Sequence, residues 1–515
     1  MQPFIHFCAL DLGAESGRVM LGEFDGERLR LSEIHRFESR PVQVPDGLHT
    51  DVLRIWSELK NGMAMAARRV NGAIAGIGVD TWGVDFAFLD KQGALIGNPY
   101  HYRDSLTDGI LPKAFRKVER AEIFEHTGLQ FMPINTLYQL YALKLRKSPF
   151  LKHADALLMM PDLFNYWLTG QTVSERTIAT TSQCYDPRRT AWALPLLERF
   201  GLPTDIFLPI VNPGSVLGGL LPQVRKEIGC RDDVSVVAPG CHDTALAVAA
   251  VPAQNKDFAY ISCGTWSILG AELHEPCITP QSLAADFTNE GGVAGTFRFL
   301  KNLTGLWLVQ ECRREWRGRG DDFSYAELTQ LAAQAEPLRS IINPSSSVFE
   351  KPGDMPAHIQ DYCAKTGQNI PESKGQIVRC ALESLALSYR YTLEQLESIL
   401  NYRLEPVHIV GGGTQNSLLC QFAADATCRR VVAGPVEATA IGNVIMQAIA
   451  LGHIGSLGEA RKIVRASFET KTYNPENQAQ WDEAYGRFIA LRVNNGNGKN
   501  HSIKLAHGAP LPAAR

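Results

Sequence analysis

The first ninety residues alternate between apolar runs and short polar segments that contain glycine. Residues 5–12 form an apolar run that includes Asp11 and leads into the turn 13–17, and the segments 18–24 and 29–37 have the composition of strands. The pattern therefore predicts that the first two strands form a hairpin, with Asp11 at the end of its first strand.

A helix and two further strands follow this hairpin. Apolar residues recur at helical spacing across 52–70, after Thr50 or Asp51, either of which can cap the helix N-terminus. Residues 73–79 and 86–89 read as strands on either side of a polar segment. This order of strand, polar or glycine-rich tip and helix predicts an α/β fold whose functional residues lie at strand ends.

The opening order returns after a polar break at 252–257. Residues 258–262 and 268–273 read as strands around the small-residue turn 263–267, which predicts a second hairpin of similar design. Residues 376–400 then have the spacing of a long amphipathic helix. We interpret the two halves as a degenerate internal repeat with a boundary at the polar break.

This repeat predicts two domains and a short terminal region. The expected division along the chain is an N-terminal domain over 1–251, a hinge or linker over 252–257, a C-terminal domain over 258–470, a helical segment over 471–493 and a disordered tail over 494–515.

Composition narrows the class of protein. The 515 residues are 45% hydrophobic and 20% charged, as in a folded globular protein, and 51 basic against 54 acidic side chains give a net charge of −3. This charge argues against a general nucleic-acid or anionic-membrane surface. The chain has no apolar run of the ~18 residues that span a bilayer and no signal-peptide pattern, so we expect a cytoplasmic protein.

The eleven cysteines lack the paired spacing of a zinc site, and their number and scatter argue against a disulfide framework. If any disulfide formed, Cys363 with Cys380 would be the first candidate.

The turn after Asp11 carries the first chemical signal. Small residues in such a turn let backbone N–H groups bind phosphate while a carboxylate at the strand end faces its metal ion. The segment 262–267 is the matching tip in the second half, and an ordinary hairpin turn explains either segment equally well when taken alone. Together, two similar hairpins facing one cleft would describe an ATP site between duplicated domains. The run 411–413 of three glycines after a strand offers close backbone approach to a ligand such as adenosine.

Asp243 lies between the apolar runs 234–238 and 245–251, at a predicted strand-to-helix junction. In isolation, a helix N-cap is the simplest interpretation of such an aspartate. A nucleophilic pair of Cys241 and His242 is disfavoured, because adjacent residues of a strand point in opposite directions.

A polar and aromatic group surrounds the strand that ends near residue 80. Carboxylates and donors beside an aromatic ring suit a sugar, although a half-buried tryptophan among solvated charges fits the pattern as well. The members are Trp82, Asp85, His101, Arg103 and Asp104.

Taken in order, these segments resemble the FGGY carbohydrate kinases. The resemblance covers roughly residues 5–470 and rests on DLGAESGRVML, DTWGVDF, HDTA, SCGTWS, TNEGG, LKNLTGLWLVQE, HIVGGGTQN and AGPVEATAIGN. It implies two RNase H-like domains of the actin and sugar-kinase superfamily around an interdomain cleft. One departure stands out, since Glu15 occupies a position where the family more often has a small residue.

The resemblance also implies roles for individual residues. Asp243 would be the general base that takes the proton from the sugar hydroxyl, and Asp11 with Asp243 would hold Mg²⁺ through water. The residues implied to contact substrate are Gly83, His242, Asp243, Thr244 and Asn302. Those implied to line the nucleotide are Ala14, Glu15, Ser16, Gly17, Arg18, Thr265, Gln310 and Gly412.

The implied reaction is transfer of phosphate from ATP to the 1-hydroxyl of L-rhamnulose in L-rhamnose degradation, with a small-molecule ketose and ATP as partners. The same chemistry on L-fuculose, L-ribulose or D-xylulose is the nearest alternative. A non-catalytic nucleotide-binding module and a hydrolase with a Cys241 nucleophile are alternatives from other classes.

Overall fold

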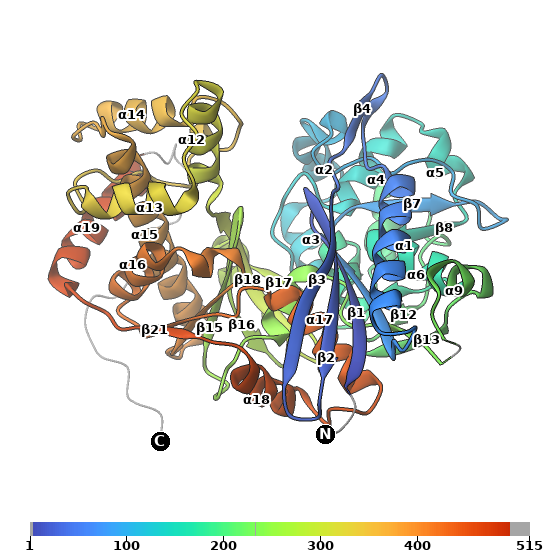
Figure 1. Ribbon diagram of the computed structural model, residues 1–515. Helices are drawn as coiled ribbons and strands as arrows, with labels where there is room; N and C mark the ends of the chain where they lie inside the picture. Colours follow the sequence, from blue (N-terminus) through green and yellow to red (C-terminus); the bar gives the residue numbers. More distant parts are fainter. Residues whose placement is uncertain (1–3, 232, 495–515) are drawn as a thin grey trace. The chain divides into compact units, whose positions relative to one another are not determined.

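The computed structural model describes residues 4–231 and 233–494 and shows two compact units (Figure 1). Within the described residues, unit 1 holds residues up to 252 together with 272–299 and 437–469, and unit 2 holds 253–271, 300–436 and residues from 470 onward.

These units differ from the contiguous division expected along the chain. The predicted break at 252–257 coincides with the point where the first segment of unit 1 ends. The structure differs from the prediction further along the chain, because two later segments also belong to unit 1, residues 272–299 and 437–469. The placement of the second segment has a packing reason, because the apolar face of the helix at 438–450 is buried in unit 1. From residue 495 on, the predicted disordered tail lies outside the described residues.

Unit 1 is built on a sheet of six strands in the order β13-β14-β6-β1-β2-β3. Its strands are β1 (Ile5–Leu12), β2 (Ser16–Phe24), β3 (Leu29–Glu38), β6 (Gly76–Thr81), β13 (Ser215–Gly219) and β14 (Ser235–Ala238). Strand β1 runs antiparallel to β2 and parallel to β6, so that Asp11 lies opposite Arg18 on one side and Asp80 on the other. The predicted hairpin is confirmed, and its pairing brings three charged residues to one end of the sheet.

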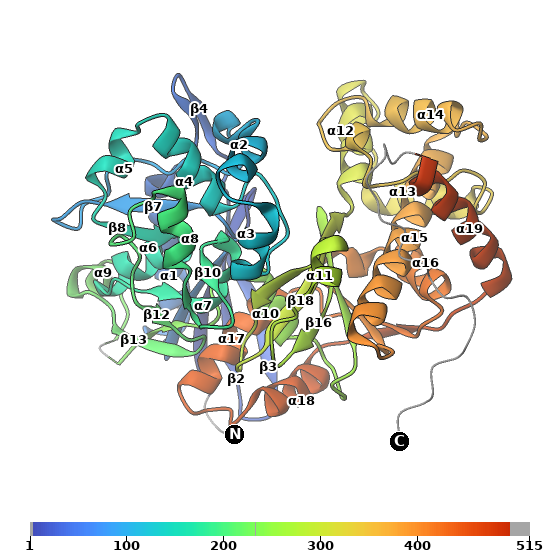
Figure 2. The ribbon, with the colours of Figure 1, turned by 180° about the vertical axis from the view of Figure 1, so that it is seen from behind.

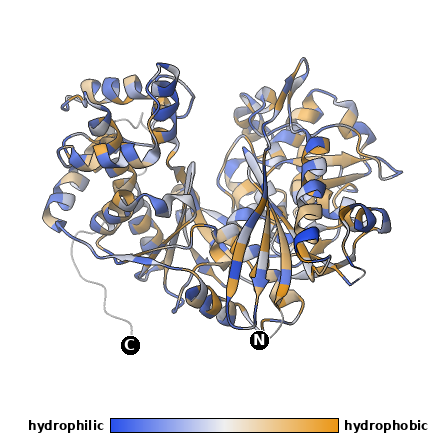
Figure 3. Ribbon diagram, in the orientation of Figure 1, coloured by the Kyte–Doolittle hydropathy of each residue, from blue (hydrophilic) through white to orange (hydrophobic). Residues whose placement is uncertain are grey.

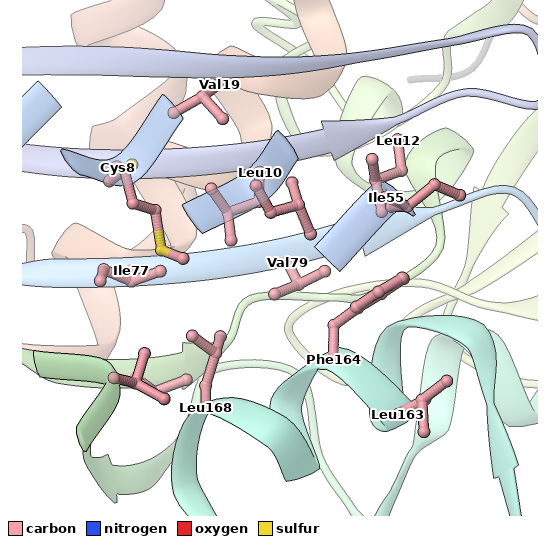
Figure 4. Packing of buried hydrophobic residues seen from close by; sticks show 14 of the residues in the cluster. Cys8, Leu10, Leu12, Val19, Ile55, Ile77, Val79, Leu163, Phe164 and Leu168 are labelled. Atoms are coloured by element: carbon pink, nitrogen blue, oxygen red, sulfur yellow. The ribbon is translucent and has the colours of Figure 1, made fainter. Parts of the chain in front are cut away.

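Helix α1 (Val52–Arg69) covers this sheet (Figure 1). The Asp51 carboxylate accepts a hydrogen bond from the Arg54 backbone N–H, which confirms one of the two predicted caps. Ile55 packs with Leu10, Val79 and other strand residues in the core of Figure 4. Hydrophobic and hydrophilic positions interleave along the strands and helices (Figure 3), as burial of one face requires.

The remaining elements of unit 1 include several short helices and hairpins. They are β4 (Val42–Val44), β5 (Gly47–His49), β7 (Phe86–Leu89), α2 (Ile110–Lys117), α3 (Arg120–Thr127), α4 (Thr136–Leu145), α5 (Pro149–His153), β8 (Ala156–Met159), α6 (Met160–Thr169), β9 (Ser174–Glu175), α7 (Arg176–Ala179), β10 (Tyr185–Asp186), β11 (Ala191–Trp192), α8 (Leu194–Phe200), β12 (Ile210–Val211), α9 (Pro222–Ile228), α10 (Asp243–Ala249), α11 (Pro280–Ala284), β17 (Thr288–Gly291), α17 (Ala438–Ala450) and α18 (Leu457–Ser467).

Unit 2 repeats the pairing pattern of unit 1. Strand β15 (Ala259–Cys263) is antiparallel to β16 (Trp266–Leu273) and parallel to β19 (Val407–Val410), as β1 is to β2 and β6. The other strands are β18 (Phe297–Thr304), which begins in unit 1, β20 (Val431–Ala433) and β21 (Lys471–Tyr473). The helices are α12 (Trp307–Gly318), α13 (Tyr325–Gln334), α14 (Met355–Lys365), α15 (Lys374–Leu400), α16 (Ser417–Thr427) and α19 (Gln478–Asn494).

The cysteines are free thiols. Cys363 and Cys380, the pair singled out from the sequence, lie on α14 and α15, and their thiols share a hydrogen bond without a disulfide. Among the residues that the structure describes, no helix is long and apolar enough to cross a membrane.

Candidate active site

The turn between β1 and β2 is stabilised by a hydrogen bond within it and by another from Ser39. The Gly13 backbone N–H donates to the Ser16 carbonyl at 3.0 Å, and the Ser39 hydroxyl donates to the Gly13 carbonyl at 2.7 Å. At Gly17, a Cβ atom would lie 2.3 Å from the Phe37 ring, so packing alone requires glycine there. The exposed Glu15 carboxylate lies 3.4 Å from the Arg103 guanidinium, which offsets its negative charge.

Arg18 lies on β2 and pairs with both Glu437 and Asp11, the aspartate at the end of β1. Burial raises the pKa of the Asp11 carboxyl, the Arg18 guanidinium opposes this, and the negative charges of Asp243 and Glu437 add to the rise. The four charged side chains of this cluster therefore act on one another within unit 1, although Glu437 is 419 positions from Arg18.

Asp80 is a further carboxylate next to this cluster and is fully buried. The Asn443 side-chain amide donates to one of its oxygens at 2.6 Å. Burial, followed by the charge of Asp11, raises the pKa of Asp80 well above its usual value. The sequence analysis did not include Asp80 in the candidate site. Asp80 lies directly opposite Asp11 on the neighbouring parallel strand, so pairing β1 with β6 would have brought the two together.

The residues present fit a magnesium ion bound through water. Among the described residues, no three or more histidine, cysteine or acidic side chains are grouped to hold a metal directly. Mg²⁺ needs no such cage, because it keeps several waters and is bound by one or two carboxylates together with substrate phosphates. Asp11 and Asp243 are two such carboxylates, and the negative charge of Asp243 is close enough to add to the rise in the pKa of Asp11.

The segment that leads into Asp243 is fixed by buried side chains. The Glu175 carboxylate accepts from the Cys241 backbone N–H at 2.9 Å, and the Thr177 hydroxyl accepts from the His242 backbone N–H at 3.1 Å. Both of these side chains are fully buried. Their contacts set the backbone from which Asp243 projects, and the sequence carries no local signal for them.

Asp243 is the first residue of α10, and His242 occupies the cap position. The interpretation of Asp243 as a helix cap is therefore wrong, because Asp243 is itself the first residue of the helix. One oxygen of the Asp243 carboxylate accepts from the Thr244 backbone N–H and, at 2.9 Å, from the Thr244 hydroxyl. About a third of the Asp243 side chain is exposed, which leaves it accessible to a ligand.

Cys241 is fully buried, and burial raises the pKa of its thiol well above the usual value. A nucleophilic cysteine needs a lowered pKa and access to substrate. The structure therefore argues against the hydrolase alternative.

Trp82 and its neighbours form a second part of the candidate site in unit 1. The Trp82 indole N–H donates to the Asp85 carboxylate at 2.9 Å, and Trp82 is mostly buried. A Cβ atom at Gly83 would lie 3.1 Å from the Thr181 side chain, so little space exists there for a larger residue. Asp104 accepts from the Leu48 and Leu106 backbone N–H groups, which gives this predicted sugar-group member a structural role.

The stability of unit 1 is expected to depend on pH through Asp85. Burial raises the pKa of Asp85 to about 7, so between pH 4 and 7 the folded state keeps a proton that the unfolded state has released. The free energy of unfolding should therefore fall as pH rises across this interval, by at most about 1.4 kcal/mol per pH unit. Urea unfolding of wild type and Asp85→Asn at a series of pH values measures this, and the variant should show the flatter profile.

Asp90→Asn is a suitable control, because Asp90 accepts backbone hydrogen bonds in an exposed turn and asparagine can do the same. A slope unchanged in Asp85→Asn would contradict the assignment.

In unit 2, the candidate nucleotide residues lie after two parallel strands. Thr265 follows β15 and its carbonyl accepts from the Trp307 backbone N–H at 3.1 Å, which ties the turn to the start of α12, where Gln310 lies. Gly412 follows β19 and is exposed, and a Cβ atom there would meet no atom within 4 Å. Because β15 and β19 are parallel neighbours, Thr265 and Gly412 lie at the same edge of the sheet. Asn302 lies on β18.

The chain belongs to the FGGY family of carbohydrate kinases, since the models of its N-terminal and C-terminal domains match residues 6–250 and 259–451. The resemblance inferred from the sequence motifs is thereby confirmed, and so is the two-domain α/β fold of this family.

Within the curated proteins, the chain is similar to proteins named rhamnulokinase. It is 44% identical over 483 residues to that of Bacteroides thetaiotaomicron, covering 94% of this chain and 98% of the relative. It is 39% identical over 465 residues to that of Oceanobacillus iheyensis, covering 90% and 97%. Among solved structures, a ligand-bound xylulose kinase from Lactobacillus acidophilus matches with a TM-score of 0.79 over 95% of this chain and 98% of that chain, and at 16% identity it supports the fold alone.

Proposed function

We propose that this carbohydrate kinase transfers phosphate from ATP to the 1-hydroxyl of L-rhamnulose and so forms L-rhamnulose 1-phosphate in L-rhamnose degradation. The observation that carries the proposal is the identity of 44% to a protein named rhamnulokinase over nearly the whole of both chains. The placement of Asp243 in unit 1, accessible and held by neighbouring donors, supports it. We also propose that the enzyme acts in the cytoplasm, with ATP and the ketose as its small-molecule partners.

In this proposal Asp243 is the general base. An ionised carboxylate can orient the sugar hydroxyl and accept its proton late in the transfer, because phosphoryl transfer depends on positioning and charge stabilisation. The Thr244 hydroxyl and backbone N–H bind one oxygen of Asp243 and so restrict its rotation. Gly83, His242, Thr244 and Asn302 are the proposed contacts of the sugar.

We propose that the turn from Ala14 to Arg18, including Glu15, Ser16 and Gly17, binds the phosphates of ATP through backbone N–H groups. In unit 2, Thr265, Gln310 and Gly412 are the proposed contacts of the nucleotide, and the open side of Gly412 leaves room for a flat ring. Bound Mg²⁺ would neutralise charge on the phosphates. Asp11 and Asp243 would hold its water ligands.

The product identifies the reaction. Purified protein incubated with ATP, Mg²⁺ and L-rhamnulose should yield ADP and a sugar phosphate whose NMR spectrum places the phosphate on carbon 1. Phosphate at another carbon, or no sugar phosphate, would contradict the proposal.

Asp11→Asn is expected to weaken the response to Mg²⁺. Asp11 is proposed to act through water, and loss of such an outer partner typically costs 10- to 100-fold in metal affinity. The measurement is the Mg²⁺ concentration that gives half-maximal activity at saturating ATP. Asp25→Asn, in the exposed turn between β2 and β3, is the matched control and should leave this concentration unchanged. An unchanged Mg²⁺ requirement in Asp11→Asn would remove Asp11 from the metal site.

A further inference from the structure

Both ring nitrogens of His242 lie close to charged side chains. Its Nε2 atom lies 3.3 Å from the Asp243 carboxylate, and its Nδ1 atom lies 2.8 Å from a terminal nitrogen of Arg298. Glu290 also lies 3.3 Å from Nδ1. The His242 side chain is thus placed between the proposed base and a buried charged pair, all within unit 1.

Arg298 is held rigidly in this position. It is fully buried on β18, its Nε donates to the Gly291 carbonyl at 3.0 Å, and its Nη2 donates to Glu290 at 2.9 Å as well as facing His242. Although burial by itself would raise the pKa of Glu290, the Arg298 charge and its hydrogen bond hold it below its usual value. The pair therefore stays charged, and the guanidinium keeps its orientation.

A guanidinium group can only donate hydrogen bonds. An Nδ1 atom that faces the Arg298 donor at 2.8 Å must therefore accept, and the ring proton of a neutral imidazole then resides on Nε2. The Nε2 atom lies 3.3 Å from the Asp243 carboxylate. Without Arg298, the remaining neighbour of Nδ1 would be the Glu290 carboxylate, which can only accept and would draw the proton to Nδ1.

We propose that Arg298 is a positioning residue that holds His242 in its Nε2–H tautomer, so that a proton rather than a lone pair lies beside the Asp243 carboxylate and keeps the proposed base in place. The Nε2–H would lie beside the Asp243 Oδ1 atom, which accepts from the two Thr244 donors, and would leave the Oδ2 atom to receive the sugar proton. In the opposite tautomer, Nε2 presents a lone pair to the carboxylate and repels it. The inference rests on the proposed function of Asp243.

The tautomer can be read directly in the full-length protein without substrates. Nitrogen-15 NMR of histidine-labelled wild type, with His242→Gln used to assign the resonance, should show a proton on Nε2 and an unprotonated Nδ1. In Arg298→Met the proton should move to Nδ1. A wild-type His242 with its proton on Nδ1 would overturn the inference, even if no variant folds.

Kinetics test the consequence for catalysis. Arg298→Met should lower kcat by about 10- to 100-fold with little change in the KM for ATP, as is typical when an outer partner of a catalytic group is lost. Glu290→Gln leaves the Arg298 donor facing Nδ1. The decrease in kcat should therefore be at least tenfold smaller than in Arg298→Met. If the buried ion pair served only to stabilise the fold, the two variants would lower kcat alike, and that result would overturn the inference.

The outcomes separate this inference from the proposed function. A wild-type protein that phosphorylates no ketose would overturn the proposed function, and with it the catalytic part of the inference. Equal losses in the two variants of an active kinase would overturn the inference alone.

Discussion

Asp243→Asn should retain ATP binding and lose phosphoryl transfer, with kcat lowered by about 10²- to 10⁴-fold, the usual contribution of a positioned general base. Asparagine has nearly the same shape and still accepts from Thr244 through its side-chain oxygen. It cannot take the proton of the sugar hydroxyl at neutral pH. The loss should therefore fall on kcat, measured by coupled detection of ADP, while the dissociation constant of ATP measured by calorimetry changes little.

Asp51→Asn is the matched control for this variant. Asp51 caps α1 through its side chain, and asparagine is an equally good N-cap, so stability and kcat should remain near those of wild type. Full activity in Asp243→Asn would refute its assignment as the base.

Gly442→Ala is expected to destabilise unit 1. Helix α17 packs against α10 (Figure 2), and a Cβ atom at Gly442 would lie 2.0 Å from the Leu246 carbonyl oxygen. Because that atom belongs to the backbone of α10, relief requires a shift of one helix, which typically costs about 1–3 kcal/mol. Thermal unfolding should show a melting temperature lower by several degrees, and α10, which begins with Asp243, is the helix displaced.

Gly458→Ala supplies the comparison. Gly458 is also a helical glycine of unit 1, on α18, but a Cβ atom there would meet only the Ser456 hydroxyl at 3.8 Å. Alanine in place of helical glycine usually stabilises by about 0.5–1 kcal/mol. If Gly442→Ala melted at the same temperature as Gly458→Ala, the close contact between α17 and α10 would be contradicted.

Local patterns made much of the fold predictable. The first hairpin, α1 with a cap at Thr50 or Asp51, and a strand before the glycines 411–413 follow from apolar runs, helical spacing and turn residues that lie close together in the sequence. The position of Asp11 at a strand end follows in the same way.

Contacts between distant segments were not predictable on these grounds. Arg18 meets Glu437 and Asp80 meets Asn443 because α17 returns to unit 1 after the whole of the second hairpin, and no local periodicity encodes that return. Nothing in the local sequence of the strand Phe297–Thr304 singles out Arg298. Its role at His242 depends on burial and on a 2.8 Å contact across 56 positions.

The specificity of the kinase is the central claim, and a panel of ketoses tests it most directly. With saturating ATP and Mg²⁺ and coupled detection of ADP, kcat/KM should be highest for L-rhamnulose among L-rhamnulose, L-fuculose, L-ribulose and D-xylulose. A higher kcat/KM for any of the other three sugars would contradict the proposed substrate while leaving the chain a member of its kinase family.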